Sequence, residues 1–212
     1  ARRHRDHRRG DKAAEHTRQR PFHPGDGDDD ARAPQVIESC QQPMQTDRAL
    51  IVFNGEIYNY IELREELVAR GRTFRTTSDT EVVLQMYEEY GDDCVRRLNG
   101  MFAFVLYDRV AGRVLAARDH FGIKPLYLHA TRERILFASE IKALLTWPGV
   151  KAVPEPECVH DYLTFQYVVG ERTMFAGITR LLPAHYLTAD IATGRVRTVT
   201  QVCRHVGAVP LE

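Results

Sequence analysis

The sequence predicts an α+β fold in which sheets pack on each other and are flanked by helices. Three observations lead to this prediction. Two stretches between residues 60 and 90 place apolar residues at helical spacing. Four short apolar runs between residues 101 and 138 then have the pattern of strands, separated by turn-rich segments. The first of these runs is almost wholly apolar, which indicates a strand that is covered on both faces.

The composition is that of an ordinary globular protein. Hydrophobic residues make up 43% and charged residues 27% of the 212 residues, and Lys plus Arg balance Asp plus Glu at 29 each. Balanced charge provides no field that would recruit nucleic acid or an anionic membrane. No apolar run approaches the roughly 20 residues of a membrane span, and no secretory signal follows the basic N-terminus. We therefore expect a cytoplasmic protein; its oligomeric state is not defined by the sequence.

Both ends of the chain are predicted to be unstructured. Residues 1–35 contain Phe22 as their only large apolar residue, so this stretch cannot bury enough surface to offset its chain entropy. Residues 200–212 show no periodicity. No metal site is predicted. The cluster of His4, Asp6 and His7 has no further ligand on a framework, and the cysteines form no C-x-x-C pair; they are Cys40, Cys94, Cys158 and Cys203.

The first half of the folded region is predicted to contain a strand and a helix. Residues 49–53 form a short apolar run that is typical of a strand. Tyr60, Leu63 and Leu67 fall at helical spacing, and Gly71 follows as a stop signal.

A second helix is predicted after a short strand at residues 73–75. The tetrapeptide Ser78-Asp79-Thr80-Glu81 has the form of a capping box, in which Ser78 and Glu81 satisfy the first N–H groups of a helix. This helix is expected to bury Val83, Met86, Tyr87 and Tyr90, and a short helix follows with Val95 and Leu98.

The second half is predicted to be mainly strands, at residues 101–107, 114–118, 126–129 and 135–138. We expect Ser139 to cap a further helix that runs through Leu145 and Trp147 and ends at Pro148-Gly149.

The dipeptide Asn54-Gly55, directly after the first strand, is a candidate for acyl-transfer chemistry. Asn-Gly after a strand is often a hairpin turn, but the residues that follow have a helical rather than a strand period. A side-chain amide beside a glycine N–H can form an oxyanion hole, in which each donor contributes about 3 kcal/mol to stabilising a tetrahedral intermediate. Glycine also lets the backbone approach a ligand closely.

Two further segments contain polar residues with more than one interpretation. Helix capping explains Ser78 and Glu81, but it does not require Asp79, whose carboxylate beside a helix start is suited to a substrate ammonium. Asp119 and His120 superficially suggest a catalytic dyad. Neighbouring residues of a strand point to opposite faces, however, so we interpret this segment as mainly structural.

Taken together, these segments resemble glutamine-dependent asparagine synthetases. The resemblance rests on Gln42-Pro43-Met44 followed, in order, by IVFNGEIYNY, SDTEVVLQMYEEYG, LNGMFAFVLYD, ARDHFGIKPLY and LFASEIKALL. The later stretch YLTFQYVVGERTMFAGITRLLPAHYL resembles the segment that leads from the glutaminase domain of that family to its synthetase domain. Residues 41–199, about three quarters of the chain, take part in this resemblance.

The resemblance implies a class II glutamine amidotransferase domain with the N-terminal nucleophile hydrolase fold, an αββα sandwich, here incomplete at its N-terminus. It implies that Asn54 and Gly55 form the oxyanion hole. Glutamine would be held by Asn54, Gly55, Glu56 and Asp79, with Asp79 at the α-ammonium. Residues 36–150 would be a partial glutaminase domain, and residues 151–199 the end of that domain and a linker toward a synthetase domain.

The sequence also departs from the family. The family begins with a cysteine whose thiolate attacks the glutamine amide and whose own α-amine acts as the base. Residue 1 is Ala here and the first cysteine is Cys40, which would need proteolysis to become N-terminal. The family's opening strand and substrate-binding arginine have no counterpart in the sequence either. We therefore expect a fragment or frameshifted product that is inactive.

The predicted function is that of the glutaminase domain of an asparagine synthase, which releases ammonia from glutamine for the ATP-dependent amidation of aspartate. No cofactor is expected in this domain, since ATP and magnesium act in the synthetase domain. The expected partners are glutamine and a synthetase domain or partner chain. Two alternatives stay open, namely a non-catalytic remnant or interaction module, and another class II amidotransferase with a different acceptor.

Overall fold

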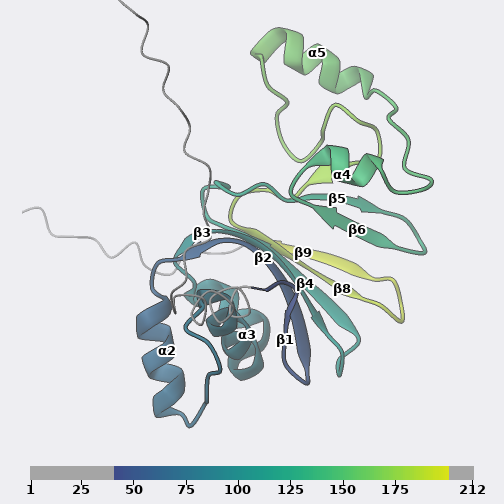
Figure 1. Ribbon diagram of the computed structural model, residues 1–212. Helices are drawn as coiled ribbons and strands as arrows, with labels where there is room; N and C mark the ends of the chain where they lie inside the picture. Colours follow the sequence, from purple (N-terminus) through teal and green to yellow (C-terminus); the bar gives the residue numbers. More distant parts are fainter. Residues whose placement is uncertain (1–40, 201–212) are drawn as a thin grey trace, which may run out of the picture.

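The computed structural model describes residues 41–200, which form two antiparallel sheets with helices on the outside (Figure 1). The first sheet contains, in spatial order, β1 (Met44–Gln45), β2 (Ala49–Ile57), β3 (Gly100–Asp108), β4 (Arg113–Arg118), β8 (His185–Asp190) and β9 (Val196–Thr200). The second sheet contains β6 (Ile135–Ala138), β5 (Tyr127–Ala130) and β7 (Thr179–Arg180). The helices are α2 (Tyr60–Ala69), α3 (Asp79–Tyr90), the 3-10 helix η1 (Gly91–Arg97), α4 (Ile141–Leu145) and α5 (Pro156–Phe165).

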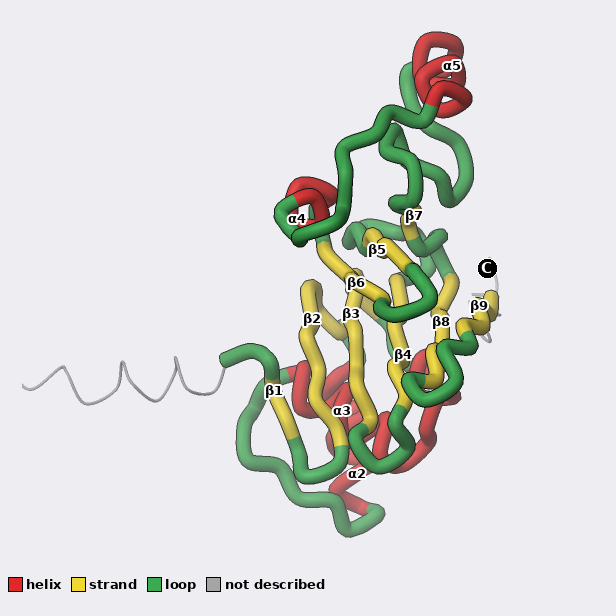
Figure 2. The backbone as a smooth tube through the Cα atoms, turned by 90° about the vertical axis from the view of Figure 1, so that its right-hand side faces the viewer, coloured by secondary structure: helices red, strands yellow, loops and turns green. Residues whose placement is uncertain are grey.

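The helices α2 and α3 cover one face of the first sheet (Figure 1; Figure 2). Alternate residues of β2 point to this face, and α2 and α3 contribute apolar residues at the spacing that the sequence predicted. The resulting core includes Ile51, Phe53, Leu63, Leu67, Val83, Met86 and Tyr87, while Tyr90 is only partly buried at its margin. Burial of these side chains therefore fixes the two helices on the sheet.

The opposite face of the first sheet packs against the second sheet. A second core lies between them and includes Ala103, Ala116, Leu126, Leu181 and Leu187. The helix α4 packs on β5 and β6 from the far side of the second sheet (Figure 1). The layers are thus helices, sheet, sheet and helix, which confirms the predicted arrangement of stacked sheets flanked by helices.

β3 is the strand that is covered on both faces, as its apolar sequence predicted. Phe102, Phe104 and Leu106 belong to the core under the helices, whereas Ala103 belongs to the core between the sheets. Its partner β2 is paired with it along the full nine residues, from Ala49 opposite Asp108 to Ile57 opposite Gly100.

Two glycines permit a close approach of β2 and β3. A Cβ atom on Gly55, which has φ +149°, would lie 2.1 Å from the Met101 carbonyl oxygen. A Cβ atom on Gly100 would lie 2.1 Å from the Glu56 carbonyl oxygen and 2.9 Å from the Ile57 Cα. Both obstacles are backbone atoms, so neither glycine can carry a side chain without moving the ladder.

The structure corrects two of the predicted element boundaries. Residues 73–75 are not a strand, because the Arg75 N–H donates to the Glu81 carboxylate at 2.8 Å instead of to a neighbouring strand. Thr200 is not part of an unstructured tail, because it ends β9 and pairs with His185 of β8. β8 and nearly all of β9 fall within residues 151–199 and belong to the first sheet.

The predicted tails lie almost wholly outside the described residues, as do Cys40 and the cluster of His4, Asp6 and His7. Within residues 41–200, none of the helices has the length and apolar character that crossing a membrane requires.

A buried carboxylate closes the turn between β3 and β4. Asp108 accepts hydrogen bonds from the Val110 and Ala111 N–H groups at 2.9 Å and from Arg48 Nε and the Tyr87 hydroxyl at 3.0 Å. Burial alone would raise the pKa of Asp108, but the hydrogen bonds from Ala111, Arg48 and Tyr87 outweigh burial and hold the pKa below its usual range.

We predict that Gly100→Ala lowers the free energy of unfolding by about 3 kcal/mol, because the new methyl group meets backbone atoms that cannot move aside. Urea unfolding followed by circular dichroism measures the change. Gly112→Ala is the matched control, since its Cβ meets nothing within 4 Å and only its φ of +62° costs energy, about 1 kcal/mol. Equal losses in the two variants would contradict the close approach.

We predict a second effect, on the pH dependence of stability. A carboxyl whose pKa is lower in the folded than in the unfolded chain gives stability that is complete above about pH 4 and is lost as the pH falls through the folded-state pKa. Asp108→Asn should therefore reduce the acid sensitivity of the unfolding free energy below about pH 4 while lowering stability at pH 7. Asp93→Asn, at an exposed carboxylate, should leave the profile unchanged. An unchanged profile in Asp108→Asn would contradict this assignment.

Candidate active site

The exposed face of β2 presents two of the predicted site residues. Asn54 and Glu56 are exposed, whereas Phe53 and Ile57 on either side point into the core under the helices. Residues two apart in a strand share a face, so the Asn54 amide and the Glu56 carboxylate point to the same side of the first sheet. No described residue forms a hydrogen bond or ion pair with the Glu56 carboxylate.

At the edge of β2 that faces away from β3, described side chains accept hydrogen bonds from the N–H groups on either side of Gly55 but not from that of Gly55 itself. The Phe53 N–H donates to Gln42 Oε1 at 2.8 Å, and the Ile57 N–H donates to Asp79 Oδ2 at 3.0 Å. Gly55 faces Phe102, whose carbonyl oxygen accepts the Asp119 N–H on its other side. No described side chain accepts the Gly55 N–H, which leaves a donor between two satisfied ones.

Asp79 lies at the first turn of α3 and is brought to the same edge. Its Oδ2 atom holds the Ile57 N–H, and its Oδ1 atom lies 3.5 Å from the Ser78 and Thr80 hydroxyls. A helix N-terminus favours negative charge, so this carboxylate is suited to the position. The structure therefore brings all four predicted residues together, Asn54, Gly55 and Glu56 on one strand and Asp79 beside its end.

The predicted capping box is only half correct. Ser78 caps α3, because its hydroxyl accepts the Thr80 N–H at 3.2 Å. Glu81 does not reach back to the Ser78 N–H, which donates to the Thr76 hydroxyl instead. The Glu81 carboxylate accepts the N–H groups of Arg75 and Thr76 and the Thr76 hydroxyl, so it fixes the loop that leads to Asp79.

Ser139 is not the cap that the sequence predicted. The N-cap of α4 is Glu140, and α4 has no side-chain capping hydrogen bond. The Ser139 hydroxyl instead accepts a hydrogen bond from Asn54 Nδ2 at 3.4 Å. Sequence reasoning missed this contact, and also Gln42 beside Phe53, because neither motif contains a signal for a long-range partner.

Asp119 has a structural role, as predicted. Its fully buried carboxylate accepts the N–H groups of Phe102, Phe121, Ile123 and Lys124 and thereby holds the turn after β4. His120 takes no part in this network among the described residues.

The described cysteines are unsuited to nucleophilic attack. Cys94 and Cys158 are both fully buried. Burial raises the pKa of each thiol, and the carboxylates of Asp92 and Asp93 raise the pKa of Cys94 further. The thiolate is the reactive form, so neither residue is a candidate nucleophile.

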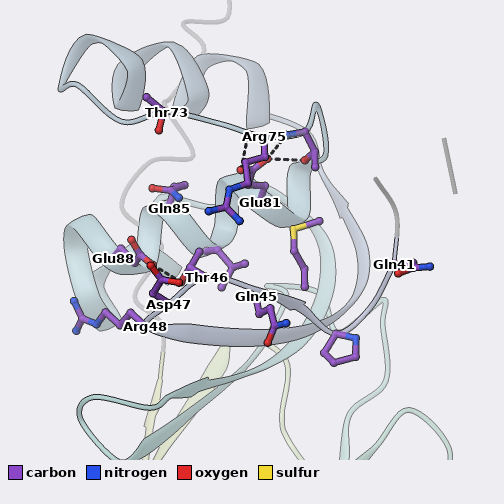
Figure 3. Close-up of a pocket in the computed structure, with 14 residues that line it drawn as sticks. Gln41, Gln45, Thr46, Asp47, Arg48, Thr73, Arg75, Glu81, Gln85 and Glu88 are labelled. Atoms are coloured by element: carbon purple, nitrogen blue, oxygen red, sulfur yellow. Dashed lines mark hydrogen bonds between the residues drawn. The ribbon is translucent and has the colours of Figure 1, made fainter. Parts of the chain in front are cut away.

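A cavity of about 420 Å³ lies elsewhere, between β1, α3 and the loop at residues 73–76. Figure 3 shows Arg75, Gln85 and Glu88 around it, with Glu88 bonded to Thr46. None of the four predicted site residues lines this cavity, which is on the helix side of the first sheet. The candidate site is therefore the edge and exposed face of β2.

Comparison with known families identifies the chain. Residues 33–200 match the glutamine amidotransferase domain. The chain belongs to this family. The predicted resemblance to glutamine-dependent asparagine synthetases is confirmed, since relatives with that name are about 40% identical to it.

Three of these relatives illustrate the similarity. Asparagine synthetase [glutamine-hydrolyzing] 1 of Bacillus subtilis is 41% identical over 154 residues, which are 72% of this chain and 24% of the relative. A putative asparagine synthetase of Mycobacterium bovis is 41% identical over 66% of this chain and 22% of its own length. One from Methanocaldococcus jannaschii is 38% identical over 72% of this chain and 30% of its own length. The chain thus spans about a quarter of the length of these relatives.

Solved structures confirm the fold. Glutamine phosphoribosylpyrophosphate amidotransferase of B. subtilis superimposes with a TM-score of 0.51 at 18% identity, over 76% of this chain and 32% of that chain. A structure described as the allosteric regulatory enzyme of purine biosynthesis gives 0.50 at 17% identity, over 76% and 30% of the two chains. The predicted N-terminal nucleophile hydrolase class of fold, with mixed sheets and helices, is confirmed.

We predict that Cys94 and Cys158 of the native chain resist alkylation, because both thiols are buried and their pKa values are raised. Iodoacetamide treatment at pH 8 followed by peptide mass spectrometry should leave both unmodified, and denaturation in urea should expose both. Rapid modification of either in the folded chain would contradict their exclusion as nucleophiles.

Proposed function

We propose that Asn54, Gly55, Glu56 and Asp79 form the glutamine site of a glutaminase domain. The observation on which this proposal rests is the Gly55 N–H, which no side chain of residues 41–200 accepts. It lies next to the Asn54 side-chain amide, so two donors of neighbouring residues are available to one carbonyl oxygen. Such donors on a rigid strand need no reorganisation when charge develops on the oxygen.

The spacing of the site suits glutamine. Asp79 binds the strand at Ile57, two residues beyond Gly55, which corresponds to about 7 Å along a strand. The α-nitrogen and the amide carbon of extended glutamine are four bonds apart, or about 5 Å with bonds of about 1.5 Å. Because a hydrogen bond at each end adds to the length of the ligand, glutamine can place its carbonyl oxygen at Gly55 and its ammonium at Asp79.

The chemistry that fits these donors is acyl transfer. A base takes the proton of a cysteine thiol, and the thiolate attacks the glutamine carboxamide carbon to form a tetrahedral oxyanion. The base returns this proton to the amide nitrogen as the C–N bond breaks, which releases ammonia and leaves a thioester, and water then hydrolyses the thioester to glutamate and the free thiol. We propose that the ammonia serves asparagine synthesis in a longer protein, as the names of the relatives suggest. ATP and magnesium would act in that remainder, and a cytoplasmic location follows from the same proposal.

One observation favours a second candidate, a domain that binds glutamine without hydrolysing it. Cys94 and Cys158, the cysteines among the described residues, are buried, so those residues supply no nucleophile. Ammonia release from glutamine separates the two candidates. Binding with turnover supports the glutaminase, and binding without turnover supports the non-catalytic domain.

We predict that Asp79→Asn weakens L-glutamine binding at least tenfold, because a charged hydrogen bond to the ammonium contributes about 1.5–3 kcal/mol. Asn retains an oxygen for the Ile57 N–H, so the fold should persist. Isothermal titration calorimetry of L-glutamine into the full chain measures the dissociation constant.

Glu62→Gln is the matched control, since it removes a negative charge from the first turn of the other helix, α2, at an exposed position. It should leave the affinity unchanged. No heat of binding with the wild-type chain, or equal affinities of wild type and Asp79→Asn, would overturn the proposed site.

A further inference from the structure

Ser139 connects the second sheet to the candidate site. It follows β6 directly, is half-buried, and accepts the hydrogen bond of Asn54 Nδ2 across 85 residues of sequence. Asn54 lies on the exposed face of β2, in the first sheet. This hydrogen bond therefore joins the two sheets at the residue that carries the proposed oxyanion donor.

No helix cap competes for the Ser139 hydroxyl. The N-cap of α4 is Glu140, and no side chain caps the helix. Among the described residues, Asn54 is the partner of the Ser139 side chain. The Ser139 hydroxyl lies near the start of α4 but does not cap it, and so it is available to accept the hydrogen bond of the Asn54 amide.

The geometry of a carboxamide gives this contact a consequence for chemistry. The Nδ2 atom of asparagine carries two hydrogens in the plane of the amide. When one hydrogen is held by the Ser139 oxygen, the direction of the second is set, because the group is planar. A fixed second hydrogen is what an oxyanion hole requires, since donors that must rotate first give less stabilisation.

We propose that Ser139 is a positioning residue that orients the Asn54 amide toward the carbonyl oxygen of glutamine. This inference rests on the proposed function, because the orientation matters only if Asn54 contacts the substrate. Ser139 itself does not touch the substrate; it acts through Asn54. The contact at 3.4 Å is long for a hydrogen bond, so its closing should accompany ligand binding.

The test follows the Asn54 side-chain amide in ¹H–¹⁵N NMR spectra of the full chain. We expect Ser139→Ala to shift the two Asn54 amide protons toward the values of a solvated asparagine and to weaken L-glutamine binding roughly threefold, as the loss of one neutral hydrogen bond predicts. Ser139→Thr keeps a hydroxyl and should restore both. Thr146→Ala is the matched control, because its hydroxyl bonds to Ala143 at the other end of α4.

The outcomes separate the two proposals. Unchanged Asn54 signals in Ser139→Ala, or equal changes in Thr146→Ala, overturn the role of Ser139 whatever happens to glutamine. Altered Asn54 signals with wild-type glutamine affinity also overturn it. The absence of any glutamine-dependent shift in the wild-type chain overturns the proposed function itself. Backbone spectra of each variant verify that the fold is kept.

Discussion

β2 and β3 approach each other more closely where Gly55 faces Phe102 and Gly100 faces Ile57 than side chains would permit. This constraint operates in the middle of the structure, because β3 is buried on both faces and each core depends on its position. The same close approach fixes the backbone of β2, the strand that carries Asn54, Gly55 and Glu56 of the candidate site. A single geometric requirement thus links the cores to the edge at which Gly55 presents its N–H group.

The two faces of β2 divide packing from binding. The residues that face the helices are buried and hold α2 and α3, while Val52, Asn54 and Glu56 on the opposite face are exposed. The second sheet covers that face farther along, over β3, β4 and β8, where its core lies. Polar groups on β2 therefore remain accessible next to a rigid, well-packed layer, which is the setting that a preorganised site needs.

Sequence patterns predicted the elements well wherever burial decides the structure. The helical spacing of Leu63 and Leu67 and the apolar run of β3 report directly which face is covered. Local motifs failed where a side chain found a partner outside the motif. Glu81 turned to the loop at Arg75, and Ser139 turned to Asn54, 85 residues away. A capping motif describes only neighbours in sequence, so it has no means of showing such contacts.

The same limit applies to the site. The sequence motifs around Asn54 and Asp79 indicated candidate residues. Only the structure shows that the Ile57 N–H donates to Asp79 and so holds this carboxylate beside the strand that carries Gly55. If Asn54 and Gly55 bind a carbonyl oxygen, the attacking group must approach the carbonyl carbon from one face of the planar amide. The Asn54 amide also contacts Ser139, the residue that follows β6 of the second sheet. The proposed glutamine site therefore draws on β2 of the first sheet, on α3 through Asp79 and, through the contact of Asn54 with Ser139, on how the two sheets pack.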